Sequence, residues 1–386
     1  MTKRSSRLSF LKQFNLASQP LASLTMSKRE YISIADARPP FYIGVDLGGT
    51  NTKIGLVDDC GHPVSWGETP TCSNAGPEDV VERISDAIHK LISNAGLKPS
   101  EIARVGLGAP GILDFAAGKM VNPTNFPGWN GFPIRDTLAK QSGLPVSFVN
   151  DASAAAYGEF WVGSGRLFHS MVMLTLGTGV GCGIIVGDLI IEGENGHGTE
   201  CGHILIDSSE NARKCSCGQL GHLEAYASAT AVIQRTKDIL KTNEPTTLRK
   251  RVRAGEEVTP LLVAQEAEKG DAVAMRIVMD TARYVALGLI SLMHTIDPSG
   301  ILIGGSMTFQ LENSTLGEQF IQRIREEVCC RTFPTLAENT VIEFASLGSD
   351  AGYLGAAGIA RLEFQRRKGP SATRQAMRKS RDLVGM

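Results

Sequence analysis

The stretch 44-GVDLGGTNTKIGLVDDCGHPVSWG-67 decides the fold. Two apolar runs flank a Gly-Gly-Thr-Asn-Thr tip, and a third run follows an Asp-Cys-Gly turn, which predicts a β-meander. An ordinary hairpin needs only two turn residues, fewer than this tip contains. The tip is rich in backbone N–H groups that no bulky side chain covers, with Asp46 before it and Lys53 after it. We therefore expect the tip to face a ligand.

The same unit occurs again farther along the chain. The stretch 170-SMVMLTLGTGVGCGIIVGDLIIEG-193 also has the pattern of strand, glycine tip, strand, turn and strand. A later apolar run, 299-SGILIGGSM-307, ends on two glycines. The repetition predicts an α/β protein of two related halves, each of which opens with a β-meander that carries a glycine tip.

Helical patterns occupy much of the remaining chain. Apolar residues recur at helical spacing over 77–95, and a long helical stretch fills much of 260–296. Further helices are expected at 316–329 and 351–366. The run 103-ARVGLGAPG-111 has the continuous apolar character of a buried strand.

Composition excludes several classes of protein. The 386 residues suffice for two domains of ordinary size. A formal net charge of −1 gives no support for bulk binding to nucleic acid, and no apolar run is long enough to span a membrane. The eight cysteines are not spaced as a secreted disulfide framework. We therefore expect a cytoplasmic protein whose partners are small molecules.

Both ends of the chain are basic. Residues 1–24 contain four Lys or Arg and no acid, so they are a transit peptide, a flexible tail, or the product of a start codon assigned upstream of Met26. We expect residues 1–40 to form a flexible extension, and deletion of 1–25 to leave activity and stability unchanged. Residues 367–386 are expected to form a solvated basic tail.

Two glycine tips that face each other across the two halves can hold a polyphosphate, because their N–H groups converge on its oxygens. Asp46 is suited to orient a Mg²⁺ through water. Either tip alone is weak evidence for phosphate, whereas two tips and the 303–305 turn in this order favour it. The candidate nucleotide-binding residues are Asp46, Gly48, Gly49, Thr50, Asn51, Lys53, Gly177, Thr178, Gly179, Gly304 and Gly305.

At this point the motifs resemble a known family. DLGGTNTK, LTLGTGVG and ILIGGSM resemble the two phosphate loops and the adenosine loop of the sugar kinase/heat-shock ATPase/actin superfamily. More narrowly, residues 41–366 resemble the ROK family (repressor, open reading frame, kinase) and its glucokinase-like members. The resemblance implies a two-lobed, actin-like (ribonuclease H-like) fold and a homodimer. The small lobe would comprise 41–162 and 351–366, and the large lobe 163–350.

The stretch 144-LPVSFVNDASAAAYGEFWVG-163 holds the candidate base. An apolar strand leads into Asn150 and Asp151, and an alanine-rich helix follows. Asp151 is therefore expected at a helix N-terminus, where the positive end of the helix stabilises a carboxylate. From the residues alone, an ordinary helix cap is the better interpretation. The resemblance instead implies that Asp151 is the catalytic base, which accepts the proton of the attacking sugar hydroxyl.

A sugar needs hydrogen-bond partners that match adjacent hydroxyls, and carboxylates and amides supply them. Each candidate alone is more often a solvated surface residue or a cap. The resemblance implies a sugar site made of Asn125, Asn150, Asp151, Glu200, His203 and Glu224. Residues 108–110 resemble the family's loop at the cleft between the lobes, and Trp129 is expected to pack its own loop.

The segment 215-CSCGQLGHLEAY-226 resembles the family's zinc motif and departs from it at one position. The usual form has three cysteines and a histidine about a dozen residues upstream; here the third cysteine position is His222. Two free thiols are the alternative to a metal site. Imidazole is an ordinary zinc ligand, so we expect one structural Zn²⁺ held by His203, Cys215, Cys217 and His222. If His222 points away, the site is empty or completed by water.

The resemblance implies an ATP-dependent hexose kinase that converts glucose to glucose 6-phosphate, with ATP and Mg²⁺ as cofactors. Kinases for N-acetylglucosamine, N-acetylmannosamine, mannose or fructose share these motifs, and polyphosphate is an alternative donor. The alternative from another class is a sugar-responsive repressor of the same family. Such repressors carry a winged helix-turn-helix, for which the roughly forty residues before the first expected strand are too few. A chaperone-type or polymerising ATPase would lack Glu200, His203 and Glu224.

Overall fold

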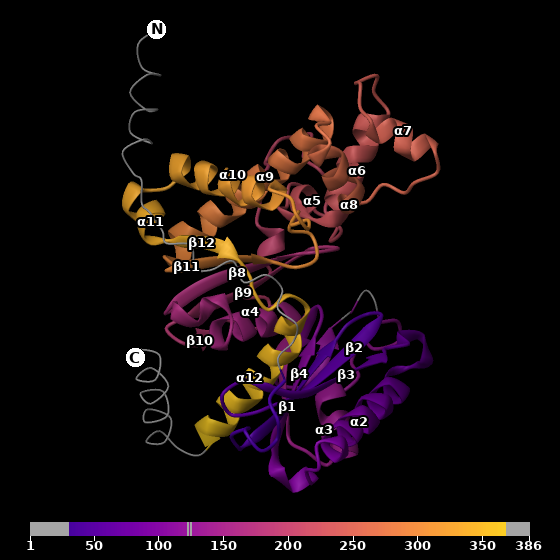
Figure 1. Ribbon diagram of the computed structural model, residues 1–386, viewed down its shortest axis with the longest axis vertical. Helices are drawn as coiled ribbons and strands as arrows, with labels where there is room; N and C mark the ends of the chain where they lie inside the picture. The colour runs from indigo at the N-terminus through magenta and orange to yellow at the C-terminus, as the bar shows by residue number, and fades with distance from the viewer. Residues whose placement is uncertain (1–30, 122, 124–125, 368–386) are drawn as a thin grey trace. The chain divides into compact units, whose positions relative to one another are not determined.

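The structure is a computed structural model that describes residues 31–121, 123 and 126–367 (Figure 1). Three predictions therefore lie wholly or mainly outside the described residues: the extension up to residue 30, the sugar contact of Asn125, and the basic tail from residue 368. Residues 31–40 are described, and the Arg38 carbonyl accepts a hydrogen bond from the Asp59 N–H at 2.8 Å. Within the described ranges, no helix combines the length and apolar character needed to cross a bilayer.

The first five-stranded sheet contains the predicted N-terminal meander. Its strand order is β3-β2-β1-β4-β7, in which β1, β2 and β3 are antiparallel neighbours and β4 and β7 run parallel to β1. The register places Asp46 opposite Lys53 on either side of the first glycine tip. The strands are β1 (Phe41–Leu47), β2 (Asn51–Val57), β3 (Pro63–Pro70), β4 (Ile102–Ala109) and β7 (Val146–Asn150).

The second sheet repeats this topology, which confirms the predicted duplication. Its order, β10-β9-β8-β11-β12, again places an antiparallel meander beside two parallel strands. The strands are β8 (Ser170–Leu176), β9 (Val180–Val186), β10 (Leu189–Ile190), β11 (Gly300–Gly304) and β12 (Val341–Phe344). A separate short hairpin joins β5 (Ile112–Asp114) and β6 (Lys119–Val121).

Alternation along β1 directs its side chains to two different helical layers. Ile43, Val45 and Leu47 share a buried cluster with helix α2 (Pro77–Asn94), as does Leu138 of α3 (Ile134–Ser142). Helix α2 begins at a proline, has two acidic residues in its first turn, and buries a stripe at helical spacing, as predicted. The intervening residues of β1, Tyr42 and Gly44, face helix α12 (Ala351–Arg367). Asp46, two residues on, lies on this face as well.

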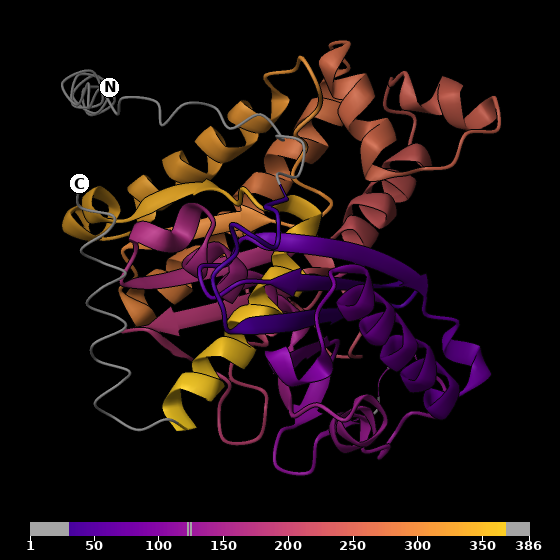
Figure 2. The same ribbon diagram turned by 60° about the horizontal axis from the view of Figure 1, so that its bottom comes forward.

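Helices α4 (Asp151–Trp161) and α12 lie between the two sheets (Figures 1 and 2). Helix α12 packs backbone to backbone against both β1 and α4, which only glycine allows: a Cβ at Gly44 of β1 would lie 1.8 Å from the Tyr353 carbonyl oxygen of α12. A Cβ at Gly355 would lie 1.6 Å from the Ala154 carbonyl oxygen of α4. Helix α12 follows the second sheet in the chain but packs on the first. The lobe boundaries at 162/163 and 350/351 stay predictions.

The expected helical stretch over 260–296 forms two helices, α8 (Pro260–Glu268) and α9 (Ala272–Ile296). Gly270, at φ +89°, ends the first, and Asp271 begins the second by accepting a hydrogen bond from the Ala274 N–H at 2.8 Å. Helix α9 packs in one core with β8 and β11. The other helices of this half are α5 (Glu224–Ala227), α6 (Ala229–Leu240), α7 (Leu248–Arg253), α10 (Leu316–Arg331) and α11 (Pro334–Asn339).

Candidate functional site

Helix α4 begins with two polar residues that have different partners. Asn150, the last residue of β7, caps the helix: its Oδ1 accepts hydrogen bonds from the N–H groups of Ala152 (2.9 Å) and Ser153 (3.2 Å). Its Nδ2 donates to the Gly111 carbonyl at 3.1 Å. Asp151 accepts a hydrogen bond only from the Ala152 N–H, at 2.8 Å, among the described residues. The capping task therefore falls to Asn150, and most of the Asp151 carboxylate is left available.

Three carboxylates converge at this point. Burial raises the pKa of Asp151 to about 7, and the negative charges of Asp46 and Glu200 add to the effect. Burial also raises the pKa of Asp46, against the opposing influence of Lys53. The three side chains come from β1, from α4 and from the residue before the short 3₁₀ turn Cys201–His203. Partly desolvated acidic groups from separate elements are typical of a functional site.

The N-terminus of α12 closes one side of Asp46. A Cβ at Gly352 would lie 2.4 Å from Asp46 Oδ2, so only glycine leaves room for the carboxylate. Lys53 reaches the same turn, where its Nζ donates to the Ser349 carbonyl at 3.1 Å. Neither contact could be predicted from the sequence. About three hundred residues separate the partners, and no local pattern joins them.

The first glycine tip is hydrogen-bonded to Thr71, the residue that follows β3. Thr71 donates its hydroxyl to the Gly48 carbonyl at 2.7 Å and its N–H to the Thr50 carbonyl at 2.8 Å. Gly48 has no room for a side chain, because a Cβ there would lie 2.5 Å from the Asn51 carbonyl oxygen. Thr71 therefore satisfies two carbonyl groups of the glycine tip. The N–H groups of the tip are left for other partners.

The second glycine tip and the third glycine turn lie side by side. They follow β8 and β11, which are parallel neighbours, so both strand ends meet at one edge of the sheet. Gly305 has φ +93°, and a Cβ there would lie 2.2 Å from the Leu176 carbonyl oxygen. The Met307 N–H donates to that same oxygen at 2.9 Å. A Cβ at Gly304 would lie 2.7 Å from Met173 Cε, so the packing of the turn requires glycine at both positions.

Glu224 links the second tip to the cysteine-containing loop. Its Oε2 accepts a hydrogen bond from the Val180 N–H at 3.1 Å, and its Oε1 accepts from the Ser216 hydroxyl. A Cβ at Gly179 would lie 2.4 Å from Glu224 Oε2. Glu200 lies near the other end of the same loop system, with its Oε2 3.8 Å from His203 Nε2. Two of the predicted sugar-binding carboxylates therefore flank the predicted metal ligands.

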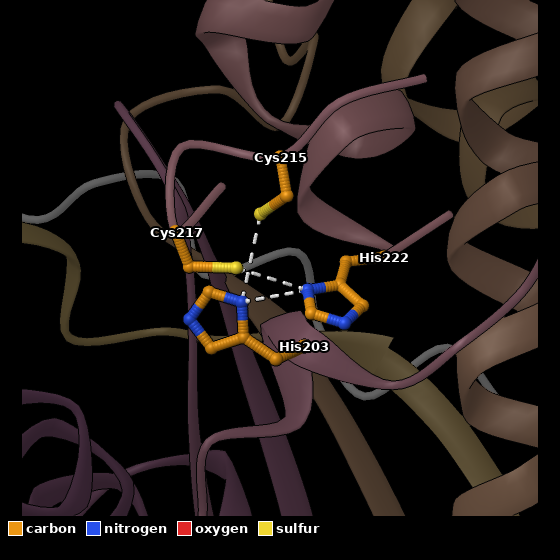
Figure 3. A group of neighbouring side chains, drawn as sticks. All are labelled: His203, Cys215, Cys217 and His222. Carbon is orange, nitrogen blue, oxygen red and sulfur yellow. Dashed lines mark hydrogen bonds between the residues drawn. The ribbon is translucent and has the colours of Figure 1, made fainter. Parts of the chain in front are cut away.

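The four predicted metal ligands form one cluster (Figure 3). Their candidate ligand atoms all lie within 4.8 Å of one another. His203 Nδ1 is 3.3 Å from His222 Nδ1 and 3.5 Å from Cys215 Sγ, and Cys217 Sγ is 3.3 Å from His222 Nδ1. His222 points into the cluster, where its position is fixed by a β-bridge to Leu205.

The spacing of the cluster fits a tetrahedral ion. Zinc bond lengths of about 2.0–2.3 Å place tetrahedral ligand atoms roughly 3.3–3.8 Å apart. Burial and the neighbouring His203 lower the pKa of His222, which keeps its imidazole neutral and able to ligate. Burial raises the pKa of the Cys215 thiol to about 11, so a metal would have to displace its proton. The donor set of two thiols and two imidazoles is complete without a further ligand.

A second group of possible metal ligands, Asp58, Cys60 and His62, has another explanation. The buried Asp58 carboxylate accepts hydrogen bonds from the N–H groups of Cys60 (2.9 Å), His62 (2.8 Å) and Arg38 (3.1 Å). The Arg38 guanidinium also lies 3.9 Å from Cys60 Sγ, where it opposes a cation. The carboxylate closes the β2–β3 turn, and we assign no metal to this group.

The duplicated sheets, with two helices between them and glycine turns at their strand ends, define an α/β protein of the actin-like ATPase fold. The chain belongs to the ROK family, whose model matches residues 42–363. The resemblance stated from the motifs is thereby confirmed.

Similar proteins include kinases and a regulator. The chain is 33% identical over 315 residues, 82% of its length, to a glucokinase of Halalkalibacterium halodurans, covering 93% of that protein. A ROK family glucokinase from Streptomyces griseus, solved in complex with glucose and AMPPNP, is 30% identical with a TM-score of 0.64; the match covers 83% of this chain and 99% of the other. A xylose repressor of Caldicellulosiruptor bescii is 29% identical over 81% of this chain and 76% of its own length.

Proposed function

We propose that the protein is an ATP-dependent hexose kinase, with glucose as the substrate and glucose 6-phosphate as the product. The observation that carries this proposal is the Asp151 carboxylate, which a neighbouring cap leaves available at a helix N-terminus, with its pKa raised to about 7. A base whose pKa lies near the working pH is suited to accept a proton in the transition state. The identity to glucokinases supports a hexose as the acceptor.

In this proposal Asp151 accepts the proton of the attacking sugar hydroxyl and orients its oxygen toward the phosphoryl group. Phosphoryl transfer needs mostly positioning and charge neutralisation, so this orientation matters as much as the proton transfer. Glu200 lies near Asp151 and contacts His203, which suits both for neighbouring sugar hydroxyls. The remaining proposed sugar contacts are Asn125, Asn150 and Glu224.

The nucleotide phosphates would be held by backbone N–H groups of the two glycine tips and the 304–305 turn. Gly48, Gly179 and Gly305 carry no side chain that could cover these N–H groups, and glycine-rich turns of this kind can form an anion-binding cradle. When bound, Mg²⁺ would supply positive charge for the phosphates, and Asp46 would hold its water ligands. The other proposed nucleotide contacts are Gly49, Thr50, Asn51, Lys53, Gly177, Thr178 and Gly304.

We further propose a structural Zn²⁺ on His203, Cys215, Cys217 and His222. Four protein ligands leave no position for a reacting water, so the ion would act on the fold and not on the chemistry. Ligation through His203 Nδ1 would direct its Nε2 toward Glu200. Ligation of Cys215 and Cys217 would fix Ser216, which donates to Glu224.

A sugar-responsive regulator is the second candidate, because the xylose repressor is also similar in sequence. A regulator needs to bind sugar but not to transfer phosphate. It therefore has no requirement for a base at Asp151 or for a carboxylate held beside the first glycine tip. The presence of both Asp46 and Asp151 in one acidic group favours the kinase.

The test is ADP release coupled to an indicator reaction, across glucose, mannose, fructose, N-acetylglucosamine and N-acetylmannosamine. We expect turnover with ATP and glucose, and none with Asp151→Asn. A parallel series with polyphosphate identifies the donor. Tight glucose binding by calorimetry without any phosphate transfer would contradict the kinase proposal and favour the regulator.

A further inference from the structure

Glu159 is a carboxylate that no part of the proposed chemistry uses, yet it is fully buried. It lies near the C-terminal end of α4, the helix that begins with Asp151. Among the described residues it forms no ion pair with a Lys, Arg or His. A buried carboxyl group without a neighbouring cation must be satisfied by hydrogen bonds, so the partners of Glu159 indicate what it does.

Those partners lie on the two chain crossings between the sheets. On the first crossing, from α4 to β8, the Ser164 N–H donates to Glu159 Oε2 at 2.9 Å and the Ser164 hydroxyl at 3.2 Å. On the second crossing, from β12 to α12, the Ser346 hydroxyl donates to Oε2 at 3.0 Å and the Leu347 N–H to Oε1 at 2.6 Å. One carboxylate therefore joins α4 to both crossings.

The two crossings also contact each other at this point. The Ser164 N–H lies 3.0 Å from the Ser346 hydroxyl oxygen, and the Ser164 hydroxyl lies 3.3 Å from the Phe344 carbonyl oxygen. Gly163 makes the arrangement possible, because a Cβ there would lie 2.1 Å from Glu159 Oε2. On the second crossing, Gly348 has φ +53°, a conformation that glycine adopts readily. Each crossing thus contains a glycine next to the residues that bind the Glu159 carboxylate, and we call this carboxylate the anchor.

We propose that Glu159 is the positioning residue about which the two sheets rotate when the protein binds sugar. Asp151 and Glu159 lie eight residues apart on one helix, about 12 Å along its axis. The anchor therefore sets where the Asp151 end of the helix stands relative to the glycine turns of the second sheet. The effect of Glu159 on kcat and KM rests on the proposed kinase function. Its effect on the radius of gyration requires only that the protein binds sugar.

The test is Glu159→Gln in the full chain. The amide keeps the shape but places its NH₂ group against the N–H of either Leu347 or Ser164, so at least one of the two crossings loses a backbone hydrogen bond. We expect the KM for glucose to rise about tenfold and kcat to fall about tenfold, because loosening the anchor disfavours the closed state and misplaces Asp151. The decrease in radius of gyration on glucose addition should become smaller.

Glu266→Gln is the matched control. Glu266 is also a buried carboxylate, but it lies on α8 and accepts hydrogen bonds from Arg251 (2.7 Å) and Lys269 (2.8 Å). Its loss should lower the melting temperature and leave kcat and KM within about twofold of wild type. A merely structural role for Glu159 would give this same pattern, so kcat and KM within about twofold in Glu159→Gln would overturn the proposal.

Two further arms keep the test decisive. If Glu159→Gln does not fold, Ser346→Ala removes one donor, and we expect the same changes in kcat and KM at about threefold; unchanged constants would refute the anchor. If the wild type releases no ADP with any hexose, the proposed function has failed. The anchor is then judged by scattering alone, where an equal response to glucose in wild type and Glu159→Gln would count against it.

Discussion

At Asn150 and Asp151, neighbouring side chains divide two tasks that one residue at a helix N-terminus often combines. Asn150 satisfies the helix N–H groups, and Asp151 keeps a carboxylate whose charge the surroundings disfavour. A group of this kind lowers the stability of the ligand-free protein whenever it is ionised. The Asp151 carboxylate therefore lowers the free energy of unfolding, and a catalytic role would explain why it is present.

Asp151→Asn should abolish turnover and stabilise the protein. We expect kcat to fall by about 10³ or more, with glucose affinity within about threefold of wild type, because the amide keeps the shape but accepts no proton. The pKa of Asp151 is about 7 in the folded protein, above that of the unfolded chain, so its ionised form costs stability above that pH. The substitution should thus add roughly 1–3 kcal/mol to the free energy of unfolding at about pH 8, measured without Mg²⁺.

The gain in stability should shrink as the pH falls through 7 and vanish near about pH 4, where Asp151 is protonated in both states. Wild-type kcat/KM should fall about tenfold per pH unit below 7, since the base must be unprotonated. Thermal unfolding of both proteins across this range provides the measurement. Turnover within threefold of wild type, or equal stability at about pH 8, would contradict the assignment of Asp151.

Gly352→Ala tests the space beside Asp46. The new methyl would lie 2.4 Å from Asp46 Oδ2, so the carboxylate has to move. We expect kcat/KM to fall about 10–100-fold and the free energy of unfolding to fall by about 1–3 kcal/mol.

The control is Gly67→Ala on β3, where the nearest atom to the new methyl is Leu91 Cδ1, at 3.8 Å. This variant should retain the activity and stability of the wild type. If Gly352→Ala has the activity and stability of the wild type, the Asp46 carboxylate can move without loss of function. That result would contradict its proposed role in orienting Mg²⁺.

At the scale of elements, the loop that holds the four-residue cluster joins the candidate sugar-binding residues Glu200 and Glu224 to the second glycine tip.

His222→Ala should lower bound zinc from about one equivalent per chain and weaken glucose binding about tenfold. His222→Cys should retain both the zinc content and the glucose affinity of the wild type. Elemental analysis of protein purified without added zinc, with calorimetry for glucose, provides the measurement. His294→Ala, at an exposed histidine on α9, is the control. Metal-free wild-type protein that binds glucose normally would refute the structural role.

Elements with a short-range signal were predictable from the sequence. Both meanders and α2 follow from local periodicity and turn residues. The grouping of His203, Cys215, Cys217 and His222 was expected from the resemblance of 215–226 to the family's zinc motif, because the residues alone left two free thiols as an alternative. The break between α8 and α9 had a signal as well, in Gly270 and the capping Asp271, but the strong helical pattern on either side obscured it.

The rest could not be predicted because it depends on contacts between distant segments. Gly352 appears in the sequence as one small residue in an Ala- and Gly-rich helix; its place beside Asp46 exists only once α12 packs on β1. Glu159 resembles any helix carboxylate until Ser164 and Ser346 meet around it. Periodicity reports which face is buried, but not which buried residue lies against which.

At the scale of the molecule, the two sheets are joined by two crossings that meet at one anchor, an arrangement suited to hinge closure. Glucose should therefore reduce the radius of gyration, and small-angle scattering with and without saturating glucose measures it. Galactose at the same concentration serves as a control for solvent contrast. An unchanged radius at saturating glucose, with binding verified by calorimetry, would contradict the hinge.

The return of α12 to the first sheet has a consequence for synthesis. The ribosome completes all five strands of that sheet by residue 150, yet the helix that covers Tyr42, Gly44 and Gly106 comes only at 351–367. During the intervening translation, the nascent first sheet has one face without its final cover. The packing of Tyr42 against Tyr353 and Leu354 is therefore completed only after the whole second sheet has been synthesised.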